Sequence, residues 1–226
     1  PQPEMAIEPM ERAETRPEIY ADFTLTADLS HLNDDQKKMI VLLIDASEIM
    51  DDLFWRQSFG DDYREWLDSI ENDRERRFAD LNYGPWDELD DDKTFMEGFA
   101  PKTLCSQLYP EVISKEEFET TFLQGKNSLY TFVRRDASGA LTVVPYHVEY
   151  REELAEAARL LREAADLSES PDFANYLKLR AAALISDDFQ LSDSYWMDVK
   201  DNEIDVVIGP IETYLDRLYG YKAAYE

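Results

Sequence analysis

The sequence has a single cysteine, two histidines and no long apolar run, and each scarcity excludes a class of protein. With Cys105 alone, no disulfide can form within the chain, so cysteine usage leaves the redox compartment open. Leu104 and Leu108 lie close to it, which indicates a small buried side chain rather than a nucleophile. Because a membrane-crossing helix needs about 18 or more apolar residues in succession, the sequence predicts no transmembrane span.

The two histidines, His31 and His147, are far apart in the sequence. A zinc site on one helix needs two closely spaced histidines with a glutamate between them, so we expect both residues to be structural. The sequence also has no glycine-rich phosphate loop and no G-x-S-x-G motif. Its own residues therefore predict no metal site and no self-sufficient catalytic set.

Basic residues are few, because 23 Lys and Arg stand against 50 Asp and Glu, for a formal net charge of −27. Such a surface repels phosphate, so nucleic acid and anionic membrane are disfavoured as partners. Two origins of the acidity remain open, a high-salt habitat and the attraction of cationic peptides. We expect Arg74, Arg76 and Arg77 to pair with neighbouring carboxylates, with capture of a substrate carboxylate as the alternative.

Apolar residues are abundant, at 44% of the chain with 12% aromatic, which is typical of a packed globular protein. Residues 1–18 contain four prolines without periodicity and predict a flexible lead-in. Residues 19–226 are expected to form one lobe. The predicted fold class is α+β and mainly α-helical, with a β-hairpin and C-terminal strands in a small mixed sheet.

Capping residues mark the predicted helices. Asn33 and Gln36 form a capping box before a helix that ends near Phe59-Gly60, and its apolar residues cover nearly the whole circumference, so we expect a buried central helix. Other predicted elements are helices over 61–78, from Ser114, over 150–167 and from Ser170-Pro171, a hairpin over 129–144, and loops over 82–101 and 187–201.

The predicted helix over 150–167 contains Arg162-Glu163, a feature of the nudix box that holds magnesium at a diphosphate. That motif also needs a paired Glu-Glu and a following glycine, whereas Ala165-Asp166-Leu167 stand here. We therefore exclude a nudix site in this helix.

The last stretch, residues 203–226, contains the strongest candidate site. β-branched residues over 204–208 predict a strand, Gly209-Pro210 interrupts it, and residues 211–214 resume an extended pattern. After Gly220 the sequence predicts a helix.

Alternation along an extended segment would place Glu212 and Tyr214 on one face. A carboxylate and a phenol two residues apart form a plausible polar site. An ordinary edge strand with a solvated face fits the same pattern, and spacing alone does not separate the two interpretations.

Three segments of the chain resemble one family: IGPIETY and its continuation over 208–226, NYGPWD over 82–87, and YWMDVKDN over 195–202. From about Tyr20 to its end, the chain is similar to the bacterial branch of the dipeptidyl peptidase III family of zinc metallopeptidases. The resemblance implies a two-lobed enzyme that removes dipeptides from the free amino end of short peptides. The family's zinc-binding helix lies further along than this sequence reaches, so the resemblance implies an amino-terminal portion that binds no zinc and is inactive alone.

The same resemblance implies roles for two side chains. Glu212 matches a glutamate that helps to bind the free α-amino group of the peptide. Tyr214 matches a tyrosine that donates a hydrogen bond to the oxyanion formed from the scissile carbonyl. Asp216 and Gly220 also match the family pattern, and we expect them to form turns.

Two function classes follow from the sequence. The first is the substrate-binding portion of a zinc exopeptidase, with a peptide as its partner. The second is a non-catalytic acidic module that binds cationic peptides or a protein partner. The chain starts at Pro1 without a methionine and shows no signal peptide, which leaves both the cytoplasm and the bacterial cell envelope open, and the oligomeric state is not predicted.

Overall fold

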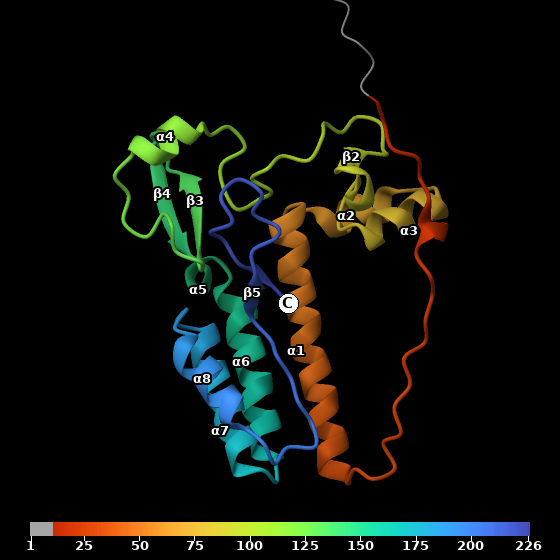
Figure 1. Cartoon of the computed structure of the whole chain (residues 1–226), viewed down its shortest axis with the longest axis vertical. Helices are drawn as coiled ribbons and strands as arrows, with labels where there is room; N and C mark the ends of the chain where they lie inside the picture. Colours follow the sequence, from red (N-terminus) through yellow and green to blue (C-terminus); the bar gives the residue numbers. More distant parts are fainter. Residues whose placement is uncertain (1–10) are drawn as a thin grey trace, which may run out of the picture. The chain divides into compact units, whose positions relative to one another are not determined.

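The computed structural model describes residues 11–226, which fall into two compact units (Figure 1). Among the described residues, the small unit comprises 11–23 and 61–103, and the large unit comprises 24–60 and 104–226. The described chain is mainly helical with three separate two-stranded antiparallel sheets. This confirms the predicted mainly helical α+β class, although the hairpin and the C-terminal strands form separate pairs rather than one mixed sheet.

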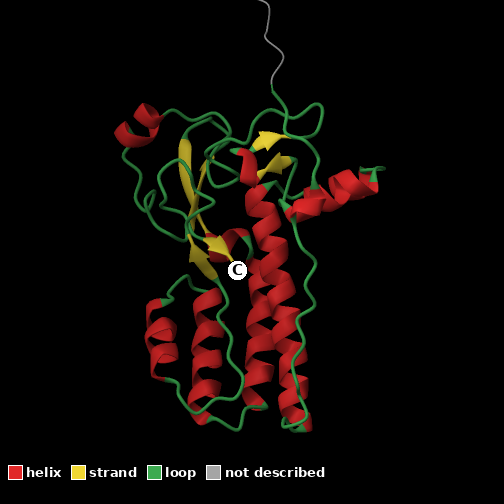
Figure 2. Cartoon of the chain, turned by 45° about the vertical axis from the view of Figure 1, so that its right-hand side comes forward, coloured by secondary structure: helices red, strands yellow, loops and turns green. Residues whose placement is uncertain are grey.

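The large unit contains six helices and four strands among the described residues. In chain order they are α1 (Asp34–Ser58), α4 (Lys115–Thr120), β3 (Thr131–Arg135), β4 (Leu141–Pro145), α5 (Tyr146–Glu149), α6 (Arg151–Asp166), α7 (Pro171–Leu184), α8 (Gln190–Asp198), β5 (Pro210–Glu212) and β6 (Ala224–Tyr225). Within this unit α6 packs between α1 and α7, and α8 packs on α7 (Figures 1 and 2). None of the described helices is long and apolar enough to cross a membrane.

Helix α1 begins as predicted. The Asn33 side chain accepts hydrogen bonds from the backbone N–H groups of Asp35 and Gln36, while the Gln36 side chain accepts one from the Asn33 N–H. These bonds satisfy donors that the first turn of a helix leaves unpaired. The expectation of burial around the whole helix was wrong, because Val41 is 57% exposed and Ile44 is 52% exposed.

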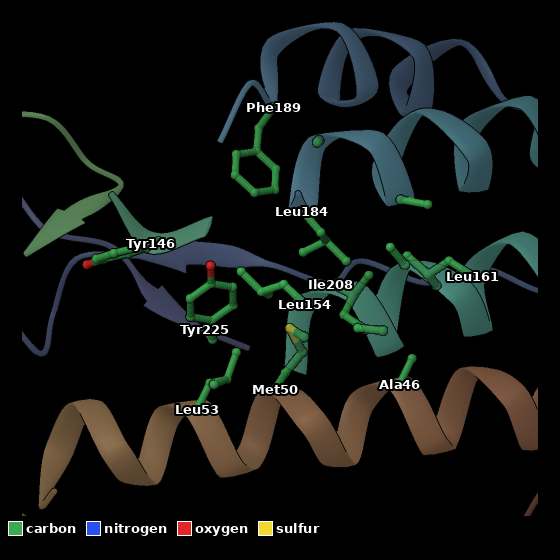
Figure 3. Close-up of a cluster of buried hydrophobic side chains, with 14 of the residues drawn as sticks. Ala46, Met50, Leu53, Tyr146, Leu154, Leu161, Leu184, Phe189, Ile208 and Tyr225 are labelled. Atoms are coloured by element: carbon green, nitrogen blue, oxygen red, sulfur yellow. The ribbon is translucent and has the colours of Figure 1, made fainter. Parts of the chain in front are cut away.

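One stripe of α1 does face the core. Its buried residues recur at three- and four-residue spacing, the period of one helix face: Met39, Leu43, Ala46, Met50 and Leu53. Figure 3 shows this stripe opposite side chains of α6 and α7, with the ring of Tyr225 among them. The core of the large unit therefore includes β6, which lies far from α1 in the sequence.

The predicted hairpin is confirmed. Strands β3 and β4 pair in antiparallel register from Thr131 opposite Pro145 to Arg135 opposite Leu141. The connecting turn has Gly139 at φ +86°, in the left-handed region that glycine adopts readily.

The small unit contains the elements η1 (Pro17–Ile19), α2 (Tyr63–Ser69), α3 (Asp73–Leu81), β1 (Trp86–Asp87), η2 (Glu88–Asp90) and β2 (Lys93–Thr94). The single helix predicted over 61–78 was wrong, because the chain is extended at Ile70 and a new helix starts after Asn72. The Asn72 side chain accepts hydrogen bonds from the N–H groups of Arg74 and Glu75 and so caps α3.

The predicted flexible lead-in, residues 1–18, lies partly outside the described residues. In its described part, Ala13 is buried and its N–H donates to the Thr94 carbonyl. The Arg16 guanidinium pairs with the buried carboxylate of Asp87 at 2.7 Å. These contacts hold residues 13–16 against the rest of the small unit.

Two expectations near the end of the chain were also wrong. The predicted loop over 187–201 contains α8, and the helix predicted after Gly220 is replaced by β6. The strand predicted over 204–208 is also absent, because these residues form none in the described structure. The pairing of β6 with β5 and its burial in the core override the local helical tendency of Lys222-Ala223-Ala224.

Candidate functional site

The two residues of the predicted site lie where β5 ends. Glu212 is the last residue of β5, and Tyr214 lies in the turn that follows, which closes with a 3.1 Å hydrogen bond from the Asp216 N–H to the Thr213 carbonyl. Strand alternation therefore does not extend to Tyr214, contrary to the extended pattern predicted over 211–214. Both side chains are exposed, and that of Tyr214 is 81% exposed.

The sheet that carries Glu212 is anchored in the core. Gly209 and Glu226 exchange two backbone hydrogen bonds of 3.0 and 2.9 Å. The fully buried side chain of Gln57, in α1, accepts a hydrogen bond from the Tyr225 N–H at 2.9 Å and donates one to the Ala223 carbonyl at 3.3 Å. A buried amide that pairs with the backbone on both sides fixes the position of β6, and through it β5.

The turn that carries Tyr214 leads into a loop organised by one carboxylate. We name residues 213–222 the Asp216 loop. Asp216 is 3% exposed and accepts five hydrogen bonds. Their donors are the backbone N–H groups of Leu218, Tyr219, Tyr221 and Lys222, at 2.9–3.1 Å, and the hydroxyl of Tyr109, at 2.7 Å.

This arrangement explains the sequence of the loop. A carboxylate has two oxygens that only accept hydrogen bonds, and here Oδ1 accepts from two donors and Oδ2 from three. Gly220 supplies a left-handed residue at φ +68° that turns the chain back toward Asp216. The Gly220 N–H itself donates to the Asp216 carbonyl at 3.0 Å. The prediction that Asp216 and Gly220 form turns is confirmed.

Tyr109 reaches Asp216 from another part of the chain. Its ring packs edge-on against Phe118 at a centroid distance of 5.8 Å. Burial, and then the hydrogen bond to Asp216, raise the pKa of the Tyr109 hydroxyl above its ordinary value. Tyr109 therefore remains a neutral hydrogen-bond donor to the buried carboxylate over the physiological pH range.

Lys222 closes the loop with a fully buried ammonium group. Its Nζ donates to the carbonyls of Lys126 and Ser128, at 2.7 and 2.9 Å, and to the Thr131 hydroxyl, at 2.8 Å. Burial lowers the pKa of Lys222 to about 8, and the charge of Asp216 opposes this change. The role of Lys222 could not be predicted from local sequence patterns, because its partners lie more than 90 positions away.

A second carboxylate lies on the same sheet as Glu212. Burial raises the pKa of the Glu226 carboxyl, and the negative charge of Glu212 raises it further. Glu226 directly follows β6, which pairs with β5, so both carboxylates belong to the same pair of strands. Glu226 was not predicted as a neighbour of Glu212, because the pairing of β5 with β6 was not predicted.

The other candidates have structural partners. His147 Nδ1 lies 2.7 Å from the carboxylate of Asp187, which also accepts its backbone N–H, as expected of a structural histidine. His31 is exposed ahead of α1. Burial raises the pKa of the Cys105 thiol, which disfavours the reactive thiolate.

Two arginines of the cluster pair with neighbouring carboxylates, as the first of the two predicted interpretations expected. Arg74 donates to Glu18 at 2.7 and 2.8 Å, and Arg77 donates to Asp22 at 2.7 Å. Arg76 donates to the Ile70 carbonyl at the end of α2.

Within residues 11–226, no three or more His, Cys, Asp or Glu side chains are grouped so that they could hold a metal ion. The described residues thus do not fit a zinc site.

Comparisons with known proteins agree with this fold. No family model matches the chain. The described fold is similar to a lobe of dipeptidyl peptidase III, and the aligned residues are also similar in sequence. Dipeptidyl peptidase III of Caldithrix abyssi is similar with a TM-score of 0.86 and 34% identity, over 91% of this chain and 41% of that chain. Dipeptidyl peptidase III of Corallococcus sp. strain EGB is similar with a TM-score of 0.84 and 32% identity, over 95% of this chain and 43% of that chain.

A curated relative carries another name. Nudix hydrolase 3 of Arabidopsis thaliana is 27% identical over 269 aligned residues, which cover 92% of this chain and 35% of that protein. The chain thus spans well under half of each of these relatives. The two solved structures confirm the resemblance to dipeptidyl peptidase III, and the coverage is consistent with an amino-terminal portion.

Proposed function

We propose that this chain is the substrate-binding portion of a dipeptidyl peptidase, an enzyme that releases dipeptides from the free amino end of peptides. The observation that carries the proposal is the placement of Glu212 and Tyr214, both exposed, on a sheet and loop anchored by buried hydrogen bonds. The likeness to dipeptidyl peptidase III, at 34% identity over 91% of this chain, supports it.

Glu212 is proposed to bind the α-amino group of the peptide. A free amino terminus is a cation, and a carboxylate forms strong charge-assisted hydrogen bonds with an ammonium group. Glu226 adds negative charge to the same region. In the described chain β5 pairs with β6 alone, and we propose that an extended peptide pairs with the other edge of β5.

Tyr214 is proposed to donate a hydrogen bond to the oxyanion that develops when the scissile carbonyl is attacked. A donor placed where negative charge appears stabilises the transition state more than the ground state. The described residues form no zinc site. Activation of the attacking water is therefore assigned to no residue of this chain.

Measurements on the complete protein that contains this chain test the proposal. We expect dipeptide release from a peptide with a free amino end and none from the same peptide with an acetylated amino end. In the variant Glu212→Gln, KM should rise on the order of 10-fold or more because a charge-assisted contact is lost. The matched control is Glu152→Gln, at an exposed position in the first turn of α6, which should behave as wild type. Equal release from the acetylated peptide would overturn the assignment of Glu212.

The second candidate function is an acidic module that binds cationic peptides without catalysis. The net charge of −27 favours it, since such a surface attracts cations over long distances. The complete protein would then release no dipeptides, and its affinity for a lysine-rich peptide would fall steeply with added salt and not depend on a free amino end.

A further inference from the structure

We infer that Asp216 is a positioning residue for Tyr214 and that Tyr109 shares this role, an inference that rests on the function proposed above. Asp216 is 3% exposed and lies inside the large unit, whereas Tyr214, two residues earlier, is 81% exposed. A buried carboxylate and an exposed phenol therefore lie two residues apart in one turn.

Tyr214 depends on its backbone for its position. Within the described structure its hydroxyl makes no hydrogen bond, and the turn that carries it is closed by the bond from the Asp216 N–H to the Thr213 carbonyl, at 3.1 Å. The carbonyl of Leu215 accepts a hydrogen bond from the Ser106 hydroxyl at 3.3 Å. Residues on both sides of Tyr214 are therefore held, and the residue itself projects from them.

Asp216 connects this turn to the core. Four backbone N–H groups of the Asp216 loop donate to its carboxylate, so the loop cannot shift without breaking several of these bonds together. The fifth donor, the Tyr109 hydroxyl, comes from 107 residues earlier in the chain. Tyr109 is 3% exposed and packs against Phe118. Its hydrogen bond therefore anchors the loop to the core.

The chemistry proposed for Tyr214 requires such a fixed point. An oxyanion donor contributes only when it lies within hydrogen-bond distance of the position that the oxyanion will occupy. A displacement of about 1 Å can reduce the rate on the order of 100-fold. Because Asp216 is buried, it acts through the backbone of Tyr214 and touches no substrate.

Two variants weaken this link to different degrees. In Asp216→Asn, an NH₂ group replaces one carboxylate oxygen and cannot accept hydrogen bonds from the N–H groups of Tyr221 and Lys222. Tyr109→Phe keeps the ring and removes only the 2.7 Å hydrogen bond, so it tests the inference even if Asp216→Asn folds poorly. Tyr195→Phe is the matched control, because this tyrosine lies in α8, outside the Asp216 loop, and its hydroxyl contacts Asp172 instead.

The test is a double-mutant cycle on kcat and KM for dipeptide release by the complete protein. We expect Tyr109→Phe to lower kcat on the order of 10-fold, and Asp216→Asn on the order of 10- to 100-fold, with KM changed less than about twofold. In the Tyr214→Phe background neither substitution should lower kcat further, because no hydroxyl remains to be positioned. Tyr195→Phe should leave kcat unchanged in both backgrounds.

The outcomes separate the two claims. An equal fall in kcat in both backgrounds would mean that Asp216 has only a general structural role, and it would overturn the inference while leaving the proposed function intact. An absence of dipeptide release by the wild-type protein would overturn the proposed function and the inference with it.

Discussion

The hydroxyl of Tyr109 donates a 2.7 Å hydrogen bond to the carboxylate of Asp216, 107 residues further along the chain. This bond joins the segment before α4 to the loop after β5, and both partners are at most 3% exposed. Of the two exposed residues of the candidate site, Glu212 lies immediately before that loop and Tyr214 lies near its start. The candidate site is therefore supported by a buried polar network rather than by contacts of its own side chains.

The Tyr109 bond should contribute measurably to stability. Tyr109→Phe leaves a buried carboxylate with one donor fewer, so we expect a loss of about 1.5–3 kcal/mol in the free energy of unfolding, the range for a hydrogen bond to a charged group. Urea unfolding followed by circular dichroism measures it. Tyr219→Phe should cost less than about 0.5 kcal/mol, because its hydroxyl lies 3.5 Å from the Lys115 carbonyl and its other partner, Glu119, is exposed. Equal losses in the two variants would contradict this account of the network.

Lys222 should make stability depend on alkaline pH. Burial lowers the pKa of Lys222 to about 8 in the folded chain, whereas an exposed lysine has a pKa of about 10.4. Between these values the unfolded chain binds a proton that the folded chain has released, so stability rises with pH there. Below pH 8 both states are protonated, and the cost of the buried charge is present in full.

The measurement is the difference in unfolding free energy between wild type and Lys222→Met from pH 7 to pH 10. It should be flat up to about pH 8 and then change in favour of wild type by at most about 1.4 kcal/mol per pH unit. Lys178→Met, at a lysine whose side chain is 52% exposed, is the control and should show no such change. A difference that stays constant across the range would show that Lys222 titrates as an exposed lysine does.

Gln57 should hold β6 against α1. Gln57→Ala removes the acceptor of the Tyr225 N–H inside the core, so we expect a loss of about 1–3 kcal/mol in stability and faster amide hydrogen exchange at Tyr225. Gln107→Ala is the control, because that side chain donates to the Phe59 carbonyl at an exposed position. Unchanged exchange at Tyr225 in the Gln57 variant would show that the strand pair holds without this contact.

The features predicted correctly from the sequence are those set by neighbouring residues. Asn33, Ser114 and Ser170 each cap a helix through a side-chain oxygen, as their positions indicated. The hairpin followed from two β-rich runs and a glycine-containing turn. Asn72 also caps a helix, and asparagine is a favoured N-cap residue. Its position therefore indicates a boundary between α2 and α3 that the predicted single helix ignored.

The features that were missed depend on distant contacts. Helix α8 has Phe189 at its N-cap position with no side-chain cap bond, and its packing on α7 stabilises it. The segment after Gly220 was expected to be a helix but forms a strand, because β5 and Gln57 supply its hydrogen-bond partners. Gln57 and Tyr225 are 168 positions apart in the sequence. Glu212 and Tyr214 were found through the resemblance, whereas the Asp216 network and Glu226 required the structure.

Salt should stabilise the chain. At a net charge of −27, repulsion between carboxylates opposes folding. Salt screens this repulsion, because the screening length falls from about 30 Å at 0.01 M salt to about 3 Å at 1 M. We therefore expect the unfolding temperature to rise steadily with sodium chloride. A variant with Asp45→Asn and Glu48→Gln, two exposed carboxylates on α1, should respond less. A salt response that is absent or reversed would show that repulsion does not limit stability.

The central claim is that Tyr214 donates a hydrogen bond in the transition state, and the most direct test is the kcat of dipeptide release by the complete protein with Tyr214→Phe. We expect kcat to fall on the order of 100-fold or more with KM nearly unchanged, because a bond made only in the transition state is removed. Tyr195→Phe, a tyrosine substitution on α8, should behave as wild type. Dipeptide release at the wild-type rate by Tyr214→Phe would contradict the account.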